Sequence, residues 1–163
     1  MRKLARVAII LVATFIVVRS GYILATRVFQ RGSLPQKLHV GWFYAEGSCG
    51  TLMSYQGAFA FSLAQDTVNL LKQQGLTSFK DIDAPNNEAE RPYFGGVWKA
   101  TPIPAGSFTG DSRNLSCGER SWLWPKGIPE ALQLPGSFYQ SIGGRSVYVL
   151  PDLGLVVAVA SDR

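Results

Sequence analysis

An uninterrupted apolar run near the N-terminus limits what this 163-residue chain can fold into more than any other feature. Residues 7–18 (VAIILVATFIVV) carry no charge and follow three basic residues. As a helix, these twelve residues rise about 18 Å, which is short of the roughly 30 Å hydrocarbon core of a bilayer. Extending the window past Arg19 to Thr26 gives twenty residues and about 30 Å, which is long enough to span a membrane.

The side chains of residues 7–26 favour insertion into a bilayer. Their eleven Ile, Leu, Val and Phe residues contribute roughly −3 to −6 kcal/mol, and Arg19 costs about 3 kcal/mol at most because it lies off-centre. The best site for a signal peptidase ends at Ala25, but Ile23 replaces the small residue expected two positions earlier. We therefore predict that residues 1–26 are an uncleaved membrane anchor. A cleaved secretory signal and an organellar presequence are the alternatives.

The boundaries of the folded part follow from this anchor. Residues 27–37 (RVFQRGSLPQK) are predicted to be a juxtamembrane linker, because Gly32 and Pro35 disfavour a continuing helix. The alternative is an anchor helix that runs on to Gln30. Both interpretations place a single small globular domain at residues 38–163. Basic residues flank the span on both sides, so charge decides its orientation only weakly.

A start that resembles a secretory signal normally leads the following chain across the membrane. We therefore expect residues 38–163 on the extracytoplasmic side, facing the periplasm from a bacterial inner membrane. The membrane lipid around residues 7–26 is then one partner, and a protein of the envelope is the other that we expect.

The distribution of charge argues against a nucleic-acid partner. Residues 1–37 hold seven of the sixteen basic residues and no acidic residue. Residues 38–163 therefore hold nine basic and eleven acidic residues, a net charge of −2, whereas a nucleic-acid-binding domain carries a basic face of its own. The composition, with 47% hydrophobic and 12% aromatic residues, is typical of a folded chain rather than a disordered one.

Cys49 and Cys117 are the two cysteines of the chain, and each precedes a glycine. Two cysteines in an exported domain favour one disulfide. Closing the loop of 68 residues between them would stabilise the fold by roughly 4 kcal/mol. Two unrelated buried thiols are the alternative for a cytosolic domain, and a reactive pair of Cys49 with His39 is formally open.

The clearest secondary structure lies at the C-terminus. Residues 146–150 (SVYVL) and 155–160 (LVVAVA) flank a short turn at 151–154, which predicts a hairpin with a second strand buried on both faces. A strand is also expected over residues 38–45. These strands predict a small, largely antiparallel sheet.

One main helix is expected over residues 63–74. Ser62 would cap its N-terminus, Gln65 would complete a capping box, and Gly75 would end the helix. Together with the strands and the preceding transmembrane helix, this predicts the α+β class.

The middle of the domain is predicted to be largely irregular. Residues 81–92 form a polar, solvated loop, and a short strand near 97–101 leads into a long loop that contains the second cysteine. A short helix is expected over 128–134, because Pro129 suits a first helical turn.

The segment 139–163 (YQSIGGRSVYVLPDLGLVVAVASDR) resembles the C-terminal β-hairpin of the serine β-lactamase and penicillin-binding-protein-like hydrolases. In that family a Gly-Gly turn leads through a strand and a Pro-centred turn to an apolar strand. The matching positions are Gly143, Gly144, Tyr148, Val149, Pro151 and 155–157. The S-x-x-K acylation motif of the family is absent, and we transfer no catalytic residue. The segment is therefore either a hairpin that the chain has in common with the family without having its function, or the remnant of a degenerate hydrolase domain.

No other motif predicts a catalytic, metal or cofactor site. His39 is the sole histidine, and the chain has neither a C-x-x-C pair nor a G-x-S-x-G elbow. The two Gly-Gly pairs lack the spacing of phosphate-binding loops. We therefore name no catalytic residue, no metal ligand and no cofactor.

Four aromatic residues are candidates for a binding surface: Trp42, Tyr44, Trp122 and Trp124. On a strand, Trp42 and Tyr44 would share one face and Phe43 the other. Exposed Trp and Tyr are enriched at interfaces, and the alternative is that they fill the core of a small domain. The function expected is that of a membrane-anchored, extracytoplasmic, non-catalytic accessory or interaction domain. A degenerate or unrecognised cell-envelope hydrolase and a single-helix subunit of a membrane complex are the alternatives.

Overall fold

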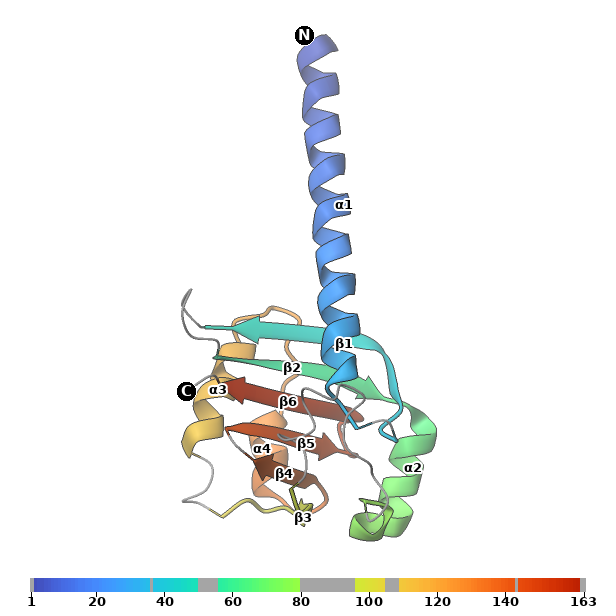
Figure 1. Ribbon diagram of the computed structural model, residues 1–163, viewed down its shortest axis with the longest axis vertical. Coiled ribbons are helices and arrows are strands. Elements are labelled where there is room, and N and C mark those ends of the chain that lie inside the picture. The colour runs from blue at the N-terminus through green and yellow to red at the C-terminus, as the bar shows by residue number, and fades with distance from the viewer. Residues whose placement is uncertain are drawn as a thin grey trace.

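A six-stranded antiparallel sheet lies at the centre of the folded part, with the strand order β1-β2-β6-β5-β4-β3 (Figure 1). The computed structural model describes residues 2–35, 37–49, 56–79, 96–104, 109–142 and 144–161. The strands are β1 (Val40–Ser48), β2 (Gln56–Leu63), β3 (Lys99–Ala100), β4 (Phe138–Ile142), β5 (Arg145–Leu150) and β6 (Leu155–Ser161). With its helices, the protein has the α+β fold that the sequence predicts.

The first element, α1 (Arg2–Gly32), is a single long helix that rises from the β1 side of the sheet (Figure 1). Its apolar part is long enough to cross a membrane, and none of that part is buried against the rest of the protein. The helix continues through most of the segment 27–37 that was expected to be a linker. The chain turns at Ser33, where the Ser33 backbone N–H donates to the carbonyl of Gln30 at 3.2 Å.

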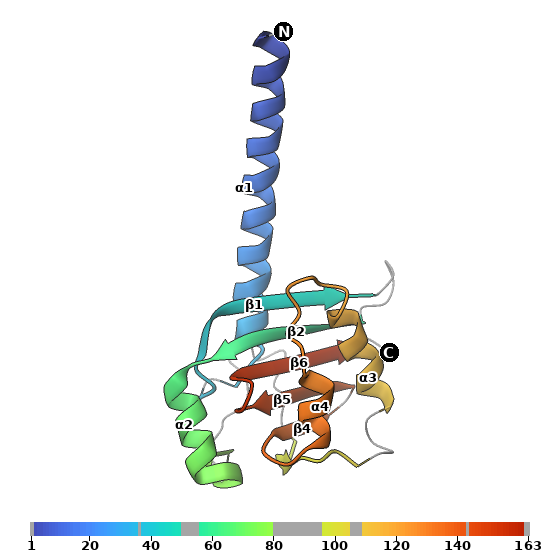
Figure 2. The same ribbon diagram turned by 180° about the vertical axis from the view of Figure 1, so that it is seen from behind.

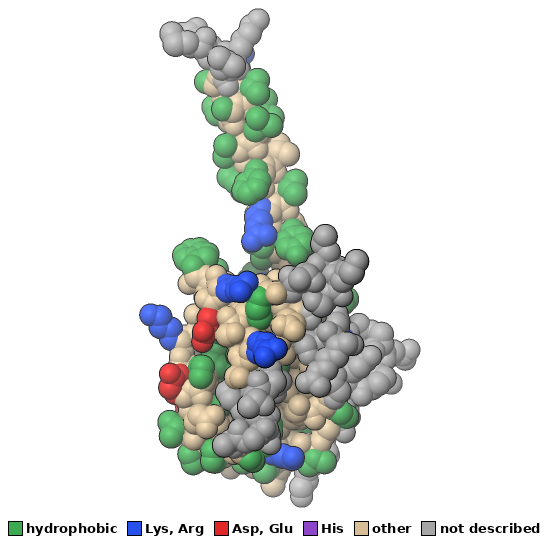
Figure 3. Space-filling model, turned by 90° about the vertical axis from the view of Figure 1, so that its left-hand side faces the viewer, with side chains coloured by type: hydrophobic (Ala, Val, Ile, Leu, Met, Phe, Trp, Pro, Cys, Tyr) green, Lys and Arg blue, Asp and Glu red, His purple; other side chains and the backbone are tan. Residues whose placement is uncertain are grey.

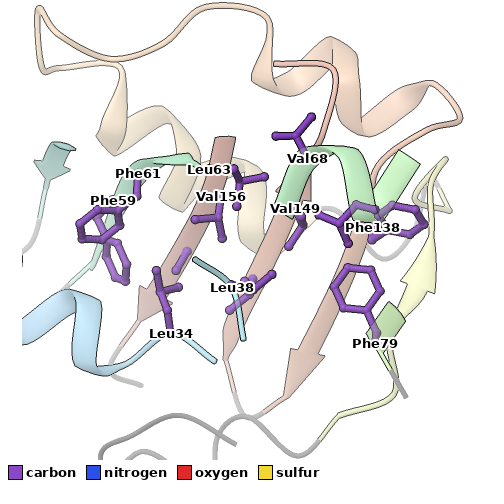
Figure 4. Packing of buried hydrophobic residues seen from close by; sticks show 13 residues of the cluster. Leu34, Leu38, Phe59, Phe61, Leu63, Val68, Phe79, Phe138, Val149 and Val156 are labelled. Carbon is purple, nitrogen blue, oxygen red and sulfur yellow. The ribbon is translucent and has the colours of Figure 1, made fainter. Parts of the chain in front are cut away.

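One face of the sheet is covered by the end of α1 and by two further helical segments, α2 (Gln65–Gln74) and η1 (Gly75–Phe79). Leu34 and Leu38, which follow the turn after α1, lie in one buried cluster with Phe59 and Phe61 of β2 (Figure 4). Because Leu34 is only 2% exposed, α1 is attached to the core of the domain directly.

The opposite face of the sheet is covered by α3 (Thr109–Gly118) and α4 (Ile128–Gln133), as the rear view shows (Figure 2). Leu115 of α3 and Ile128 and Leu132 of α4 form one buried cluster there with Ala58 and Ala60 of β2 and with residues 157 and 159 of β6. β2 and β6 are therefore covered on both sides.

The predicted start of the main helix is wrong by two residues. Residue 64 precedes α2 without a side-chain cap, and Ser62 belongs to β2, where its hydroxyl accepts a hydrogen bond from the Phe43 backbone at 3.3 Å. The Ser62 side chain is therefore bonded to β1 and does not cap α2. The predicted end is correct, since Gly75 has φ +55° and its N–H donates to the carbonyl of Leu71.

The predicted long loop around the second cysteine is also wrong. Cys117 lies near the end of the helix α3, which packs on β2. The C-terminal hairpin β5–β6 and the short helix α4 are confirmed, with Pro129 in the first turn of α4. The polar loop predicted at 81–92 and Gly143 of the Gly-Gly turn lie outside the described residues.

Candidate functional site

The C-terminal part of α1 is held against the edge strand β1 by an arginine. The Arg27 guanidinium donates to the carbonyl of Gly41 at 3.1 Å, and its central carbon lies 4.9 Å from the centre of the Trp42 ring. A cation over the face of a Trp ring is attracted by the ring quadrupole. The two contacts fix the end of α1 relative to β1.

A groove of about 590 Å³ opens between α1, β1 and the turn that follows α3. We call it the anchor groove. It is lined by Arg19, Tyr22, Ile23 and Thr26 of α1, by residues 44–48 of β1, and by residues 120–123. Figure 3 shows Lys and Arg side chains at the base of the long helix and on the part of the domain next to it. A smaller hollow of about 340 Å³ adjoins the lower part of α1, lined there by Arg27, Arg31 and Trp42.

The charges around the anchor groove are mainly positive. Arg19 lines it from α1, and Arg120 lines it from the turn after α3. Glu46 is its one acidic residue among those described, and the Tyr44 hydroxyl donates a hydrogen bond to the Glu46 carboxylate. The groove thus has two arginine side chains and a carboxylate that is already hydrogen-bonded.

The turn that carries Arg120 and Trp122 is held in place by the disulfide. Cys49 and Cys117 are bonded, with their Cα atoms 5.3 Å apart, as the sequence predicts. After Cys117 the chain forms a tight turn in which the Ser121 and Trp124 backbone N–H groups donate to the carbonyls of Gly118 and Ser121, each at 2.9 Å. The wall of the groove therefore has a defined conformation.

Two glycines permit this close approach of β1 and the end of α3. A Cβ on Gly47 would overlap the backbone of Cys117 and Gly118, and a Cβ on Gly118 would lie 2.5 Å from the Trp124 ring. Real Cβ atoms do not approach other atoms so closely, and a larger residue at either position would separate β1 from the turn.

The four aromatic residues singled out in the sequence divide into two pairs. Trp42 and Trp122 are 87% and 91% exposed. Tyr44 packs on Phe61 with ring centres 4.9 Å apart, and Trp124 packs against the core on the α3–α4 face. Three of the four contribute to the two hollows beside α1, namely Tyr44, Trp122 and Trp42. Trp124 instead supports the turn beneath them.

Sequence reasoning missed the arginines and Glu46 of this site. Arg19 was assessed only as a cost of membrane insertion, although a basic residue near one end of an apolar span is itself a signal of an interface. Nothing in the local sequence of Arg120 or Glu46 shows that they line a groove with α1, because Glu46 is about 20 to 27 residues and Arg120 about 95 to 100 residues away from the α1 residues of the groove.

Away from the groove, His39 and Asp66 form an exposed pair, with Nδ1 and Oδ2 3.4 Å apart. The Thr67 backbone N–H and, secondarily, the His39 side chain hold the pKa of Asp66 below its usual value. Among the described residues, Asp66 is the one side-chain partner that His39 has. The described part of the chain contains no group of three or more metal-ligating side chains.

No protein-family model, no curated protein and no solved structure matches this chain. The resemblance of residues 139–163 to the hydrolase hairpin therefore stays a prediction.

Proposed function

We propose that this protein is a single-pass membrane protein whose folded part, residues 38–163, lies on the extracytoplasmic side and serves as a non-catalytic accessory or interaction domain. The observation that carries the proposal is the exposed apolar surface of α1. Large side chains along its length, including Ile9, Leu11 and Val17, are more than half exposed. A soluble protein rarely exposes a contiguous apolar surface of this length, whereas a bilayer covers it.

The way in which α1 joins the domain supports an activity close to the membrane surface. Seven residues separate the end of α1 from the start of β1, and Leu34 and Leu38 among them are buried in the core. The domain therefore has no free tether on which to leave the bilayer. A disulfide in the folded part supports an oxidising compartment, because such bonds are rare in the cytosol.

Membrane partition tests the anchor. The full chain should stay with the membrane pellet after alkaline carbonate extraction, and its intact mass should include residues 1–26. Replacing Val12 and Ile16 together with arginine adds about 5–7 kcal/mol to the cost of insertion and removes the gain from both apolar residues. Together with the cost of about 3 kcal/mol at most for Arg19, this exceeds the roughly 3–6 kcal/mol that the apolar residues contribute. This variant should become extractable.

The matched control places the same two charges on the exposed surface of the domain, as Leu70→Arg with Leu76→Arg. That variant should remain in the pellet. A wild-type chain found in the carbonate supernatant, or one whose mass lacks the first 25 or so residues, would contradict the anchor. A C-terminal fusion to a reporter enzyme that requires disulfides should be active, and an inactive, correctly inserted fusion would contradict the proposed side.

A separate measurement tests whether the protein is non-catalytic. The same membranes, treated with a fluorophosphonate probe or a labelled penicillin, should show no stoichiometric modification of this protein. A serine labelled at about one mole per mole would identify a nucleophile and would favour the hydrolase instead.

A further inference from the structure

We propose that the anchor groove binds the headgroup of an anionic phospholipid from the bilayer that α1 spans. The inference rests on the membrane anchoring proposed above and names a ligand for the surface where the anchor meets the domain. It requires that the groove lie at the level of the lipid headgroups, that its charge suit a phosphate, and that its rim suit the membrane interface.

The position of the groove along α1 meets the first requirement. A hydrocarbon core of about 30 Å takes up about twenty residues of helix, which from Val7 extends to Thr26. Thr26 lines the groove, and Arg27 bonds to β1 one residue later. Its other α1 residues, Arg19, Tyr22 and Ile23, lie up to about 10 Å nearer the middle of this window, so the groove runs along the last third of the window and ends where the hydrocarbon core gives way to headgroups.

Arg19 lies within the apolar window, about 12 Å along the helix from Arg27. An arginine at this depth extends its long side chain toward the nearer interface to keep its charge hydrated. Its side chain lines the groove on the domain side. A lipid phosphate at that position would supply a partner for a charge that is costly within the apolar window.

The charge of the site meets the second requirement. Arg19 and Arg120 line the groove, and Arg27 and Arg31 line the adjoining hollow. Glu46 is the one acidic residue among the described residues that line the groove and the hollow, so four arginines stand against one carboxylate there. Guanidinium groups form strong, charge-assisted hydrogen bonds to phosphate oxygens. An anionic headgroup, such as that of phosphatidylglycerol, adds a net negative charge that a zwitterionic headgroup lacks.

The aromatic rim meets the third requirement. Trp122 lines the groove and Trp42 lines the hollow beside it, and both are almost fully exposed in the protein alone. Leu123, next to Trp122, is exposed as well. Tryptophan is enriched where membrane and water meet, because its ring is apolar and its N–H is polar. Contact with the interfacial region would cover these side chains.

A strand from another protein is the competing occupant. Among the described strands, β1 pairs only with β2, and residues 44–48 of β1 form part of the groove. An added strand would bind mainly through backbone hydrogen bonds and would show no dependence on lipid charge. The excess of arginine favours the lipid, and lipid charge is the variable that the experiment changes.

The experiment uses the full chain in bilayers that contain spin-labelled phosphatidylglycerol or spin-labelled phosphatidylcholine. Electron paramagnetic resonance measures the fraction of each lipid that the protein immobilises. Phosphatidylglycerol should be preferred. A basic residue near an anionic surface contributes about fivefold to association, so Arg120→Gln should lower the preference about fivefold. Raising the ionic strength should weaken it as well, since exposed charges are screened.

Arg113→Gln is the matched control, because Arg113 is an exposed arginine on α3 outside the residues that line the groove. It removes the same charge and should leave the preference within about twofold of the wild type. Both variants replace exposed side chains, and matched thermal midpoints by circular dichroism would exclude unfolding as the cause of any difference.

A second measurement reports on the rim. Tryptophan emission of the wild type should be quenched by phosphatidylglycerol brominated in the upper part of its acyl chains. Trp122→Phe should lose much of this quenching. Trp98→Phe should retain it, because Trp98 lies outside the groove and stacks on the buried Phe79, with ring centres 4.2 Å apart.

The outcomes separate this inference from the membrane anchoring. A chain that does not enter bilayers at all would overturn the anchor and the groove proposal together. A chain that inserts but immobilises the two lipids equally would overturn the groove proposal alone. Equal losses in Arg120→Gln and Arg113→Gln would also overturn it, because the preference would then come from overall charge.

Discussion

Loss of the Cys49–Cys117 disulfide should lower the free energy of unfolding of the folded part by about 4 kcal/mol. The bond closes a loop of 68 residues, and opening it restores the conformational entropy of that loop in the unfolded chain. In the folded state the bond joins the end of β1 to the end of α3, which carries the turn of the anchor groove. We expect the loss of stability to appear without a change of fold at low temperature.

The measurement is chemical denaturation of the full chain in detergent, followed by near-ultraviolet circular dichroism. The variant is Cys49→Ser with Cys117→Ala, because Cys117 is fully buried and a hydroxyl there would add the cost of an unpaired polar group. Wild-type protein reduced with dithiothreitol is the control and should unfold close to the variant. A variant within about 1 kcal/mol of the oxidised wild type would contradict the prediction.

The parts of the fold that could be predicted from sequence are those with local causes. The apolar run defines α1, the paired β-prone segments define the β5–β6 hairpin, and Pro129 marks the first turn of α4. In each case, the residues that specify the element lie within it or next to it. The disulfide was also predictable, because the chain has no third cysteine.

The elements that were missed depend on contacts between distant segments. The sequence of α3 (TGDSRNLSCG) is rich in residues of low helix propensity. Its helix is stabilised by burial of Leu115 and by the bond to Cys49. In β2, phenylalanines alternate with alanines, so the large side chains meet one layer and the small ones fit beneath helices on the other. These alanines did not predict a strand, because a small side chain is favourable there only where a helix packs closely on the sheet.

In the candidate site, too, some features could be predicted from the local sequence and others depend on contacts between distant segments. Aromatic residues could be identified from the sequence as candidates for a binding surface. Whether each of them is buried or exposed depends on the folded sheet. Tyr44 and Trp42 are two residues apart, and one packs on Phe61 whereas the other is exposed. Their strand has an irregular register with β2 between Val40 and Tyr44, which no sequence pattern shows.

Replacing Leu34 with alanine should lower the free energy of unfolding by about 2–5 kcal/mol and loosen the attachment of α1 to the domain. Leu34 lies two residues beyond the end of α1 and is buried in the cluster that also contains Leu38 and Phe61. Truncation of a buried leucine removes apolar contacts and leaves a cavity that the surrounding structure fills only partly. The same change at Leu70 of α2, which is 44% exposed, should cost less than about 1 kcal/mol and serves as the control.

The attachment can be measured separately from stability. Spin labels at Thr26 on α1 and at Ser48 on β1, both on the wall of the groove, should give one narrow distance distribution in the wild type. In Leu34→Ala the distribution should broaden, because Arg27 would then be the main remaining link between α1 and β1. If Leu34→Ala lost stability but kept the narrow distribution, the arginine contacts alone would fix the groove. If neither quantity changed, the burial of Leu34 would contribute little to stability or to the attachment of α1, and the prediction would be wrong.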